Sequence, residues 1–296
     1  MPISTLIAAG AFESGIISDA CDRLANAGCA PAEIEWTEPG KAVDIGFEGN
    51  ILDARLALAP LEGIADIAVQ TSANRRKMLL VSDMDSTMIT VECIDELADY
   101  AGIKPEIAAI TERAMAGELD FAEALKARVA LLAGLDEKVI AQCLEERVRA
   151  MPGAETLVRT MAGWGAHTVL VSGGFTSFTS PVAAMVGLAE VHANVLEIVN
   201  GRLTGNLVGE IVDAQCKRDV LLAATAAKNL ASDQVLAVGD GANDLPMIAA
   251  AVEGQGLGAG YHPRPALAAA ANFSVRHNDL TALLYAQGVR RHEWTC

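Results

Sequence analysis

Basic residues are scarce in this sequence. Its 296 residues include 22 Lys and Arg against 38 Asp and Glu, so the formal net charge is −16 at pH 7. A surface of that sign repels nucleic acid and anionic membranes, and neither is expected as a partner. It also repels phosphorylated substrates at long range. Any phosphate site in this chain therefore needs positive charge of its own close to the phosphate.

Paired cysteines and long apolar runs are absent as well. The six cysteines form no Cys-x-x-Cys pair and no metal-type spacing with the five histidines, so reduced thiols are expected. Residues 160–189 carry no charged side chain, but glycines and Pro181 interrupt them. No apolar stretch approaches the roughly 20 residues of a spanning helix. The N-terminus also lacks the basic region of a secretory signal. The sequence therefore predicts a soluble, cytoplasmic protein.

A short apolar run at residues 78–81 is present, and it leads into two acids, Asp83 and Asp85. Alternate residues of an extended segment point the same way, so both carboxylates can face one pocket. In α/β sheets, ligands bind at the C-terminal edge of the strands. Two close carboxylates repel each other, so a cation or a shared proton is expected between them. Taken alone, the pattern also fits a solvated acidic turn.

Three later segments place polar residues in comparable positions. Each could be ordinary by itself, as a turn, a surface lysine or an acidic loop. Together they lie at the predicted strand ends of one sheet, which argues against independent coincidence. Their polar residues are Ser172 and Gly173 after the apolar run at 168–171, Lys217 after a β-rich segment, and Asp240, Asn243 and Asp244 after the apolar run at 235–238.

These four segments, in this order, resemble the haloacid dehalogenase-like phosphatases and phosphotransferases. The stretches DMDSTMITVECIDE, MAGELDFAEALKARVALL, VSGGF and VGDGANDLPM are similar, more narrowly, to the phosphoserine phosphatase family. The resemblance covers residues 76–290. It implies an α/β fold with a Rossmann-like parallel sheet core and an inserted helical cap. It also implies Mg²⁺-dependent hydrolysis of O-phospho-L-serine, the last step of serine biosynthesis.

The resemblance assigns a role to each polar residue. Asp83 would be the nucleophile that forms an aspartyl-phosphate, and Asp85 the acid and later the base of the two half-reactions. Mg²⁺ would be held by oxygen ligands, namely Asp83, the backbone carbonyl of Asp85, and Asp240. The phosphate would be bound by Ser172, the amide of Gly173, Lys217 and Asn243, with Asp244 orienting Lys217.

Residues 92–150 contain no strand pattern and predict four helices, at 92–101, 105–114, 121–132 and 136–149. Asp120 and Asp136 are the expected N-caps of the last two. An all-helical insertion between sheet strands resembles the lid of the family, which covers the active site.

Arg128 falls within the apolar stripe of helix 121–132. That position suits an arginine stem lying on apolar surface, or a guanidinium that binds a carboxylate, and the resemblance favours the second. Glu92 lies opposite the apolar stripe of its own helix, so periodicity alone predicts a solvated side chain. By resemblance, Glu92 would bind the ammonium of phosphoserine, and Met115 and Phe121 would form an apolar wall of the lid.

Residues 1–75 alternate strand and helix patterns in the order β-α-β-β-α-β, which predicts a small ferredoxin-like sheet. This resembles the ACT-like domains that precede the catalytic part of many bacterial phosphoserine phosphatases. The predicted division is therefore 1–75 and 76–296. A regulatory amino-acid site and a stabilising or oligomerising module, as in a homodimer, both fit the pattern.

Two other functions remain open at this point. A phosphotransferase would pass the phosphoryl group to another alcohol through the same aspartyl-phosphate. An amino-acid-sensing protein with a relict phosphatase domain would need no chemistry, and the intact Asp83, Asp85, Lys217 and Asp240 argue against it.

Overall fold

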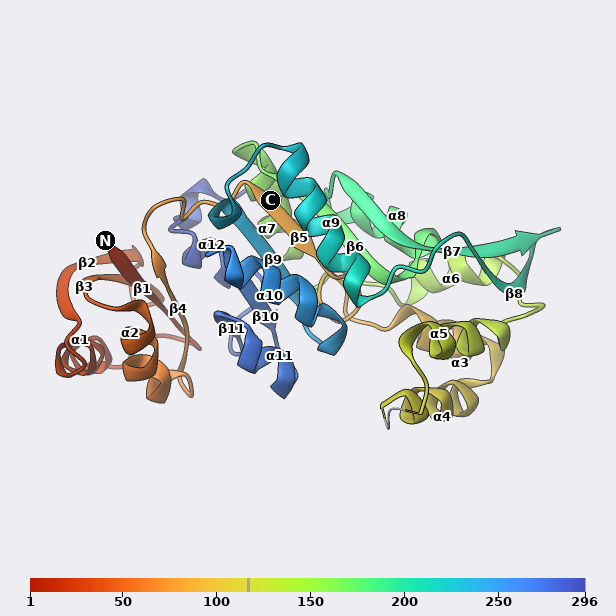
Figure 1. Cartoon of the computed structure of the whole chain (residues 1–296), viewed down its shortest axis with the longest axis horizontal. Helices are drawn as coiled ribbons and strands as arrows, with labels where there is room; N and C mark the ends of the chain where they lie inside the picture. The colour runs from red at the N-terminus through yellow and green to blue at the C-terminus, as the bar shows by residue number, and fades with distance from the viewer. Residues whose placement is uncertain (116–117, 296) are drawn as a thin grey trace.

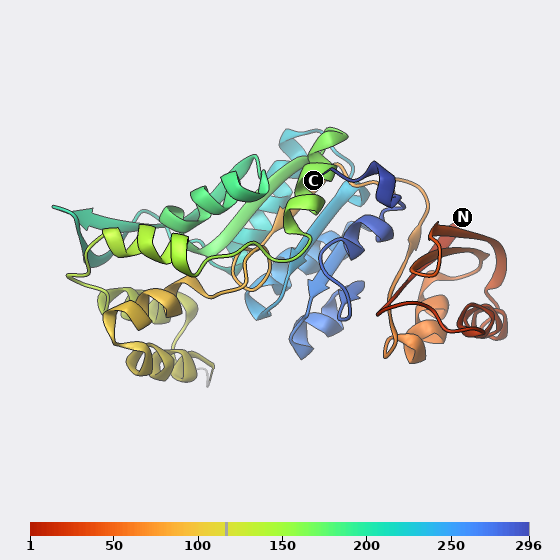
Figure 2. The ribbon, with the colours of Figure 1, turned by 180° about the vertical axis from the view of Figure 1, so that it is seen from behind.

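The computed structural model describes residues 1–115 and 118–295 and contains two β-sheets (Figure 1). The smaller sheet, from the N-terminal part of the chain, lies at one end of the molecule, and a group of helices lies at the other (Figures 1 and 2). Among the described residues, every helix is too short or too polar to span a bilayer.

The N-terminal sheet has the β-α-β-β-α-β order that the sequence predicted. Its elements are β1 (Pro2–Ala8), α1 (Ile16–Asn26), β2 (Ala30–Glu38), β3 (Ala42–Glu48), α2 (Ile51–Leu58) and β4 (Ala65–Thr71). The strands follow the antiparallel order β2-β3-β1-β4. Leu24 of α1 and Leu58 of α2 pack with Leu6 and Ile45 in one buried cluster, so the two helices cover one face of the sheet.

The larger sheet has seven strands in the order β11-β10-β9-β5-β6-β7-β8, and only the β7–β8 pair is antiparallel among the described residues. The predicted parallel α/β core is therefore confirmed. Its strands are β5 (Leu79–Ser82), β6 (His167–Phe175), β7 (Glu190–Val199), β8 (Arg202–Val208), β9 (Val235–Gly239), β10 (Leu257–Tyr261) and β11 (Phe273–Val275).

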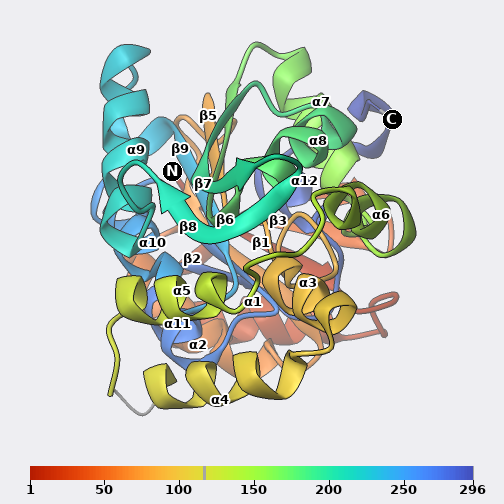
Figure 3. The same cartoon turned by 90° about the vertical axis from the view of Figure 1, so that its right-hand side faces the viewer.

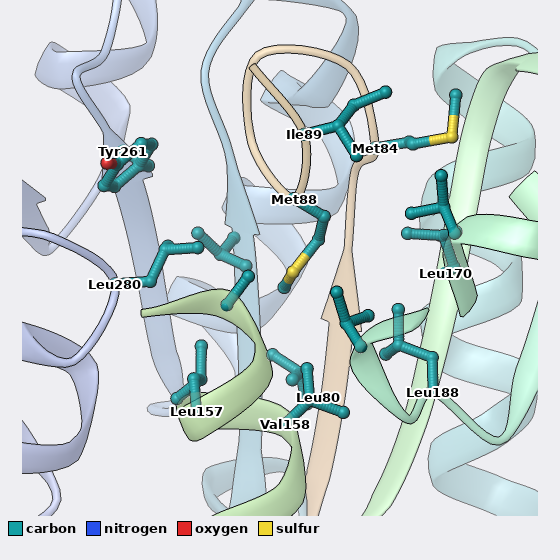
Figure 4. Packing of buried hydrophobic residues seen from close by; sticks show 14 of the residues in the cluster. Leu80, Met84, Met88, Ile89, Leu157, Val158, Leu170, Leu188, Tyr261 and Leu280 are labelled. Carbon is teal, nitrogen blue, oxygen red and sulfur yellow. The ribbon is translucent and has the colours of Figure 1, made fainter. Parts of the chain in front are cut away.

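Helices cover both faces of this sheet because alternate residues of its strands point to opposite sides. Leu80 faces one layer, where it packs with Leu157 and Val158 (Figure 4). Leu79 and Val81 face the other layer. The first layer contains α7 (Ala154–Gly163), α8 (Thr176–Val186) and α12 (Ala282–Ala286), and the second contains α9 (Ala214–Ala227), α10 (Leu245–Glu253) and α11 (Pro265–Ala270). Short 3₁₀ turns occupy Ala59–Leu61, Ser232–Gln234, Ala242–Asp244 and Arg291–Glu293.

Among the described residues, four helices stand between β5 and β6, where the sequence predicted an all-helical insertion. They are α3 (Cys93–Ala101), α4 (Lys104–Met115), α5 (Phe121–Ala130) and α6 (Lys138–Glu146). Asp120 caps α5 with a complete capping box, as expected. Helix α6 begins at Lys138 with Glu137 at the N-cap position, one residue after the expected N-cap Asp136. The side chain of Asp136 still accepts an amide of the first turn, that of Lys138 at 3.0 Å, and its backbone forms an isolated β-bridge with Arg202.

Strands β7 and β8 form a long arm that reaches the cap. Asn200 and Gly201 both have positive φ angles, 51° and 77°, as the predicted Asn-Gly hairpin turn requires. The amide of Gly134, beyond α5, donates to the carbonyl of Leu203 at 2.8 Å, and the amide of Leu203 donates to the carbonyl of Leu135 at 2.9 Å. Figure 3 shows α3 and α5 between this arm and the outermost helix, α4.

Candidate active site

Asp83 lies at the C-terminal end of β5, which is hydrogen-bonded to β6 on one side and β9 on the other and is buried along its whole length. Its amide donates to the carbonyl of Val238 at 3.0 Å. The amide of Met84 donates to Asp83 Oδ1 at 2.7 Å. Met84 and Met88 are themselves fully buried and anchor the loop in the core (Figure 4). The carboxylate of Asp83 is therefore held rigidly at the strand end.

Lys217 joins two of the predicted acids. Its Nζ lies 2.7 Å from Asp83 Oδ1 and 2.8 Å from Asp244 Oδ1, and the side chain is 1% exposed. Burial disfavours the ammonium, but the two carboxylates outweigh it and raise the pKa of Lys217 above its ordinary value. The second oxygen of Asp244 accepts the amides of Asp240 and Gly241, at 3.1 and 3.2 Å. Asp244 thus orients both Lys217 and the loop after β9.

Three carboxylates converge beside this lysine. Asp83, Asp240 and Asp244 each place one oxygen within 4.8 Å of the others. Burial, then Asp83 and Asp244, raise the pKa of Asp240 to about 7. Lys217 supplies one positive charge against three acids, so negative charge remains to be balanced. Clustered carboxylate oxygens are the ligands that hard divalent cations prefer, and the cluster fits such an ion.

Asp85 lies two residues beyond Asp83, and its carboxyl is not part of this three-acid cluster. The amide of Cys93, at the start of α3, lies 3.4 Å from its Oδ1. Burial is the main reason why the pKa of Asp85 is raised well above its ordinary value, and the charges of Glu92 and Asp83 add to the effect. Asp85 is therefore disposed to hold a proton two residues from Asp83, whose carboxylate is paired with Lys217.

Ser172 and Gly173 lie at the C-terminal end of β6, next to the loop of Asp83. A side-chain carbon added to Gly174 would lie 3.3 Å from Asp85 Oδ2, which places this strand end beside the acids. The amide of Gly174 donates to Ser172 Oγ at 2.9 Å. Asn243 Nδ2 donates to Asp83 Oδ2 at 3.2 Å. The structure thus brings the predicted residues of all four segments to one edge of the sheet.

Of the predicted cap residues, Phe121 approaches this edge directly. Phe121 Cζ would lie 2.9 Å from a side-chain carbon at position 173, so only glycine leaves room for the ring. Glu92 is exposed, and its Oε1 accepts the hydroxyl of Ser86 at 2.8 Å. The side chain of Met115 lies outside the described residues.

Arg128 is half-buried and donates from Nε to the carbonyl of Ala124 at 3.3 Å. Burial lowers the pKa of Arg128, while Asp95 and Glu92 act in the opposite direction. No ion pair joins Arg128 to an acid among the residues that the structure describes. Its guanidinium therefore lies in the field of Glu92 without being neutralised by direct contact.

One further basic residue, Arg264, adjoins the site although sequence reasoning did not select it. Its amide donates to the carbonyl of Asp240 at 2.9 Å, and its positive charge opposes the burial that raises the pKa of Asp240. Arg264 follows β10, so the same rule of polar residues after strand ends would have found it.

Comparisons with known proteins agree with this geometry. Residues 80–249 match the haloacid dehalogenase-like hydrolase family. A phosphoserine phosphatase of Streptomyces coelicolor is 42% identical over 97% of this chain and 67% of its own length. A crystal structure of a probable phosphoserine phosphatase from Vibrio cholerae is 34% identical and superposes with a TM-score of 0.77, over 99% of this chain and 87% of that one.

A phosphoserine phosphatase structure with an analogue of the phospho-aspartyl intermediate also superposes on the chain. Its TM-score is 0.64 at 32% identity, over 71% of this chain and 98% of that one. This chain belongs to the haloacid dehalogenase-like hydrolases and, within them, to the phosphoserine phosphatase family.

Proposed function

We propose that the chain hydrolyses O-phospho-L-serine to L-serine and inorganic phosphate through an aspartyl-phosphate on Asp83. The observation that carries this proposal is the pairing of two unlike carboxyl groups at one strand end. Asp83 is paired with Lys217 at 2.7 Å, and burial raises the pKa of Asp85 two residues away. A fixed anionic nucleophile beside a protonated acid is what the first half-reaction needs.

In that half-reaction a carboxylate oxygen of Asp83 forms a bond to phosphorus as the bond from phosphorus to the serine oxygen breaks. Oδ1 accepts bonds from both Met84 and Lys217, whereas among the described residues Oδ2 accepts only the longer bond from Asn243, so Oδ2 is the oxygen more available for attack. The proton of Asp85 moves to the departing serine oxygen.

In the second half-reaction Asp85, now a carboxylate, takes a proton from a water whose oxygen attacks the same phosphorus. The bond from phosphorus to Asp83 breaks, and Asp83 returns as a carboxylate beside Lys217. Inorganic phosphate leaves, and Asp85 is again protonated for the next turnover.

The phosphate would be held by local donors, as the acidic net charge of the chain requires. We assign this role to the Ser172 hydroxyl, the Gly173 amide and Lys217, with Asn243 beside them. On the cap side, the free guanidinium of Arg128 would take the substrate carboxylate and Glu92 its ammonium, with the ring of Phe121 excluding water.

We propose Mg²⁺ as the cation of the carboxylate cluster. Asp83 and Asp240 would hold it together with the backbone carbonyl of Asp85, and Asp244 would orient the site from Lys217. When bound, it would neutralise the charge of the attacking carboxylate and of the phosphate. A cytoplasmic location is part of the same proposal, and the five cysteines that the structure describes are all free thiols, as it requires.

The test is phosphate release from phosphoserine, phosphothreonine and a nucleoside monophosphate, each with Mg²⁺ and with EDTA. We expect phosphoserine to be hydrolysed fastest, only with the metal. Addition of homoserine with a search for phosphohomoserine separates hydrolysis from phosphotransfer. Rapid hydrolysis in EDTA, or equal rates on all three substrates, would contradict the proposal.

A further inference from the structure

Strand β6 leaves its regular pairing with β7 just where the phosphate-binding residues lie. Val171 pairs with His192 and Phe175 pairs with Asn194, so three residues of β6 stand opposite a single residue of β7. A bulge of this kind withdraws backbone groups from the ladder and re-aims them. Ser172 and Gly173 are inside the bulge. Their backbone groups must find partners outside the regular sheet, because unpaired buried carbonyls and amides are costly.

The side chain of Asn194 supplies such a partner. It is 2% exposed, and its Nδ2 donates to the carbonyl of Gly173 at 2.8 Å. Its Oδ1 accepts the amide of Val212 at 2.9 Å. Asn194 therefore joins the bulge of β6 to the segment that leads into α9. Neither partner is near Asn194 in sequence, so this role is invisible to motif analysis.

The hydrogen bond to Gly173 fixes one peptide of the bulge at both ends. Its carbonyl is held by Asn194, and its N–H, which belongs to Gly174, donates to Ser172 Oγ at 2.9 Å. Because the hydroxyl oxygen of Ser172 already accepts a bond there, its own proton is free to donate elsewhere. The orientation of that hydroxyl thus depends on the peptide that Asn194 holds.

The bond to Val212 reaches the other half of the proposed phosphate site. Val212 precedes Asp213, whose side chain caps α9 by accepting the amide of Cys216 at 2.8 Å. The amide of Lys217 in turn donates to the carbonyl of Asp213 at 3.1 Å. One buried amide therefore connects the strand end that carries Ser172 with the helix start that carries Lys217.

We infer that Asn194 is a positioning residue for phosphate binding, which sets the Ser172 hydroxyl and the start of α9 at a fixed separation. The inference rests on the proposed phosphate contacts of Ser172, Gly173 and Lys217. Asn194 does not touch the reacting atoms in this scheme and acts only through the groups it holds.

The test is the variant Asn194→Asp, which keeps an acceptor for the Val212 amide but turns a carboxylate oxygen toward the Gly173 carbonyl. A matched control is Asn272→Asp. Asn272 bridges backbone in the same way, with Nδ2 donating to the Gly256 carbonyl at 2.8 Å and Oδ1 accepting the Gly258 amide at 2.9 Å. It directly precedes β11 and so lies at the N-terminal ends of the parallel strands, away from the C-terminal ends that carry the site.

Inorganic phosphate is the probe, measured as a competitive inhibitor with the full-length protein, alongside kcat, KM and the thermal midpoint. We expect Asn194→Asp to raise the inhibition constant of phosphate about tenfold, since buried hydrogen bonds of this kind are lost. Asn272→Asp should lower the thermal midpoint about as much as Asn194→Asp does, and it should leave the inhibition constant of phosphate unchanged. A merely structural role for Asn194 would give both variants the same profile.

Ser172→Ala separates failure of the inference from failure of the proposed site. If Ser172→Ala weakens phosphate inhibition and Asn194→Asp does not, the inference is overturned and the phosphate site stands. If neither weakens it, the proposed contacts fall and the inference falls with them. Should Asn194→Asp not fold, Asn194→Ser is the replacement, because its hydroxyl is too short to bridge both partners and should give the same tenfold change.

Discussion

Buried acids occur in two regions of this molecule, and they are satisfied in different ways. Between the N-terminal sheet and the larger sheet, Asp44 receives both guanidinium nitrogens of Arg75, at 2.6 and 2.7 Å, and the hydroxyls of Thr5 and Thr37. At the edge of the larger sheet, Asp83 and Asp244 share Lys217, and Asp240 lies beside them with its pKa raised to about 7.

Asp66, which is 1% exposed, follows the first pattern. Its carboxylate accepts the amides of Arg276 and His277, at 2.7 and 3.1 Å, and the side chain of Asn278 at 2.8 Å. The acids between the two sheets thus stand singly among donors of the chain, whereas three carboxylates crowd together at the strand ends around one lysine. An excess of negative charge that the chain does not balance with its own basic residues indicates where a cationic ligand would bind.

The contacts between the two sheets also indicate what the N-terminal residues contribute. Arg75 also donates to the carbonyls of Tyr285 and Ala286, and Gln70 donates to Ala286 at 2.7 Å. These buried contacts support a stabilising role for residues 1–75. A regulatory amino-acid site, which the ACT-like pattern also suggested, stays a prediction.

The largest expected effect comes from removing the nucleophile. Asp83→Asn should lower kcat on phosphoserine by at least about 10⁴-fold, because an amide cannot form the aspartyl-phosphate. Lys217 keeps Asp244 as its counterion, so the fold should persist. Circular dichroism and the thermal midpoint provide the control. Turnover near the wild-type rate would remove Asp83 from the mechanism.

The next largest effect should appear at Asp44, between the two sheets, and it should change stability instead of turnover. Asp44→Asn leaves Arg75, whose side chain is only 14% exposed, without a charge partner, and the loss of one partner of a buried pair typically costs about 3–5 kcal/mol of unfolding free energy. Arg23→Met is the matched control, since its exposed pair with Asp19 is worth only about 0.5 kcal/mol. Urea denaturation measures both. Equal small losses would show that the Asp44 pair does not stabilise the arrangement of the two sheets.

A smaller effect should distinguish substrate recognition from chemistry within the site. Arg128→Ala and Glu92→Gln each remove a charge-assisted contact, worth about 1.5–3 kcal/mol, or about one to two decades in kcat/KM for phosphoserine. Hydrolysis of p-nitrophenyl phosphate, which has neither ammonium nor carboxylate, should be largely spared. Arg113→Ala, an exposed arginine of the same cap, is the control. Equal losses on both substrates would rule out the amino-acid recognition model.

The smallest effect should be a gain of stability when Asp240 is replaced by Asn in the metal-free protein. The folded protein holds a proton on Asp240 up to about pH 7, whereas the unfolded chain releases it near pH 4, so this residue destabilises the fold increasingly as pH rises between those values. In EDTA, the unfolding free energy of Asp240→Asn should equal that of the wild type at pH 4.5. At pH 8 it should be higher by about 1 kcal/mol, after allowance for solvent screening. A constant difference across that range would contradict the raised pKa.

Sequence reasoning predicted which residues meet at one edge of the sheet because strand ends follow a simple rule. Apolar runs predicted β5, β6 and β9, and in a parallel sheet their C-terminal ends must meet. This rule is sufficient to place Asp83, Ser172 and Asp240 close together. Periodicity also placed Glu92 at an exposed position, as found, although it could not show the bond to Ser86.

The interactions that sequence reasoning missed depend on contacts between distant segments. Asp44 and Arg75 are 31 residues apart, and Asp66 and Asn278 are 212 apart, with no motif to connect them. The bulge of β6 depends on its pairing with β7, so Asn194 had no signal of its own. Asp136 accepts the Lys138 amide as the capping rule expects, but its bridge to Arg202 of β8 is a tertiary contact that the local rule cannot anticipate.

The most direct test of the cation site is thermal unfolding during a Mg²⁺ titration without substrate, on the wild type and on Asp240→Asn. A ligand that binds only the folded state raises its stability with concentration. We predict a saturable rise of the thermal midpoint for the wild type and no rise for the variant. An equal rise in both proteins, or none in the wild type, would contradict the claim that the carboxylates of Asp83 and Asp240 form a site completed by a cation.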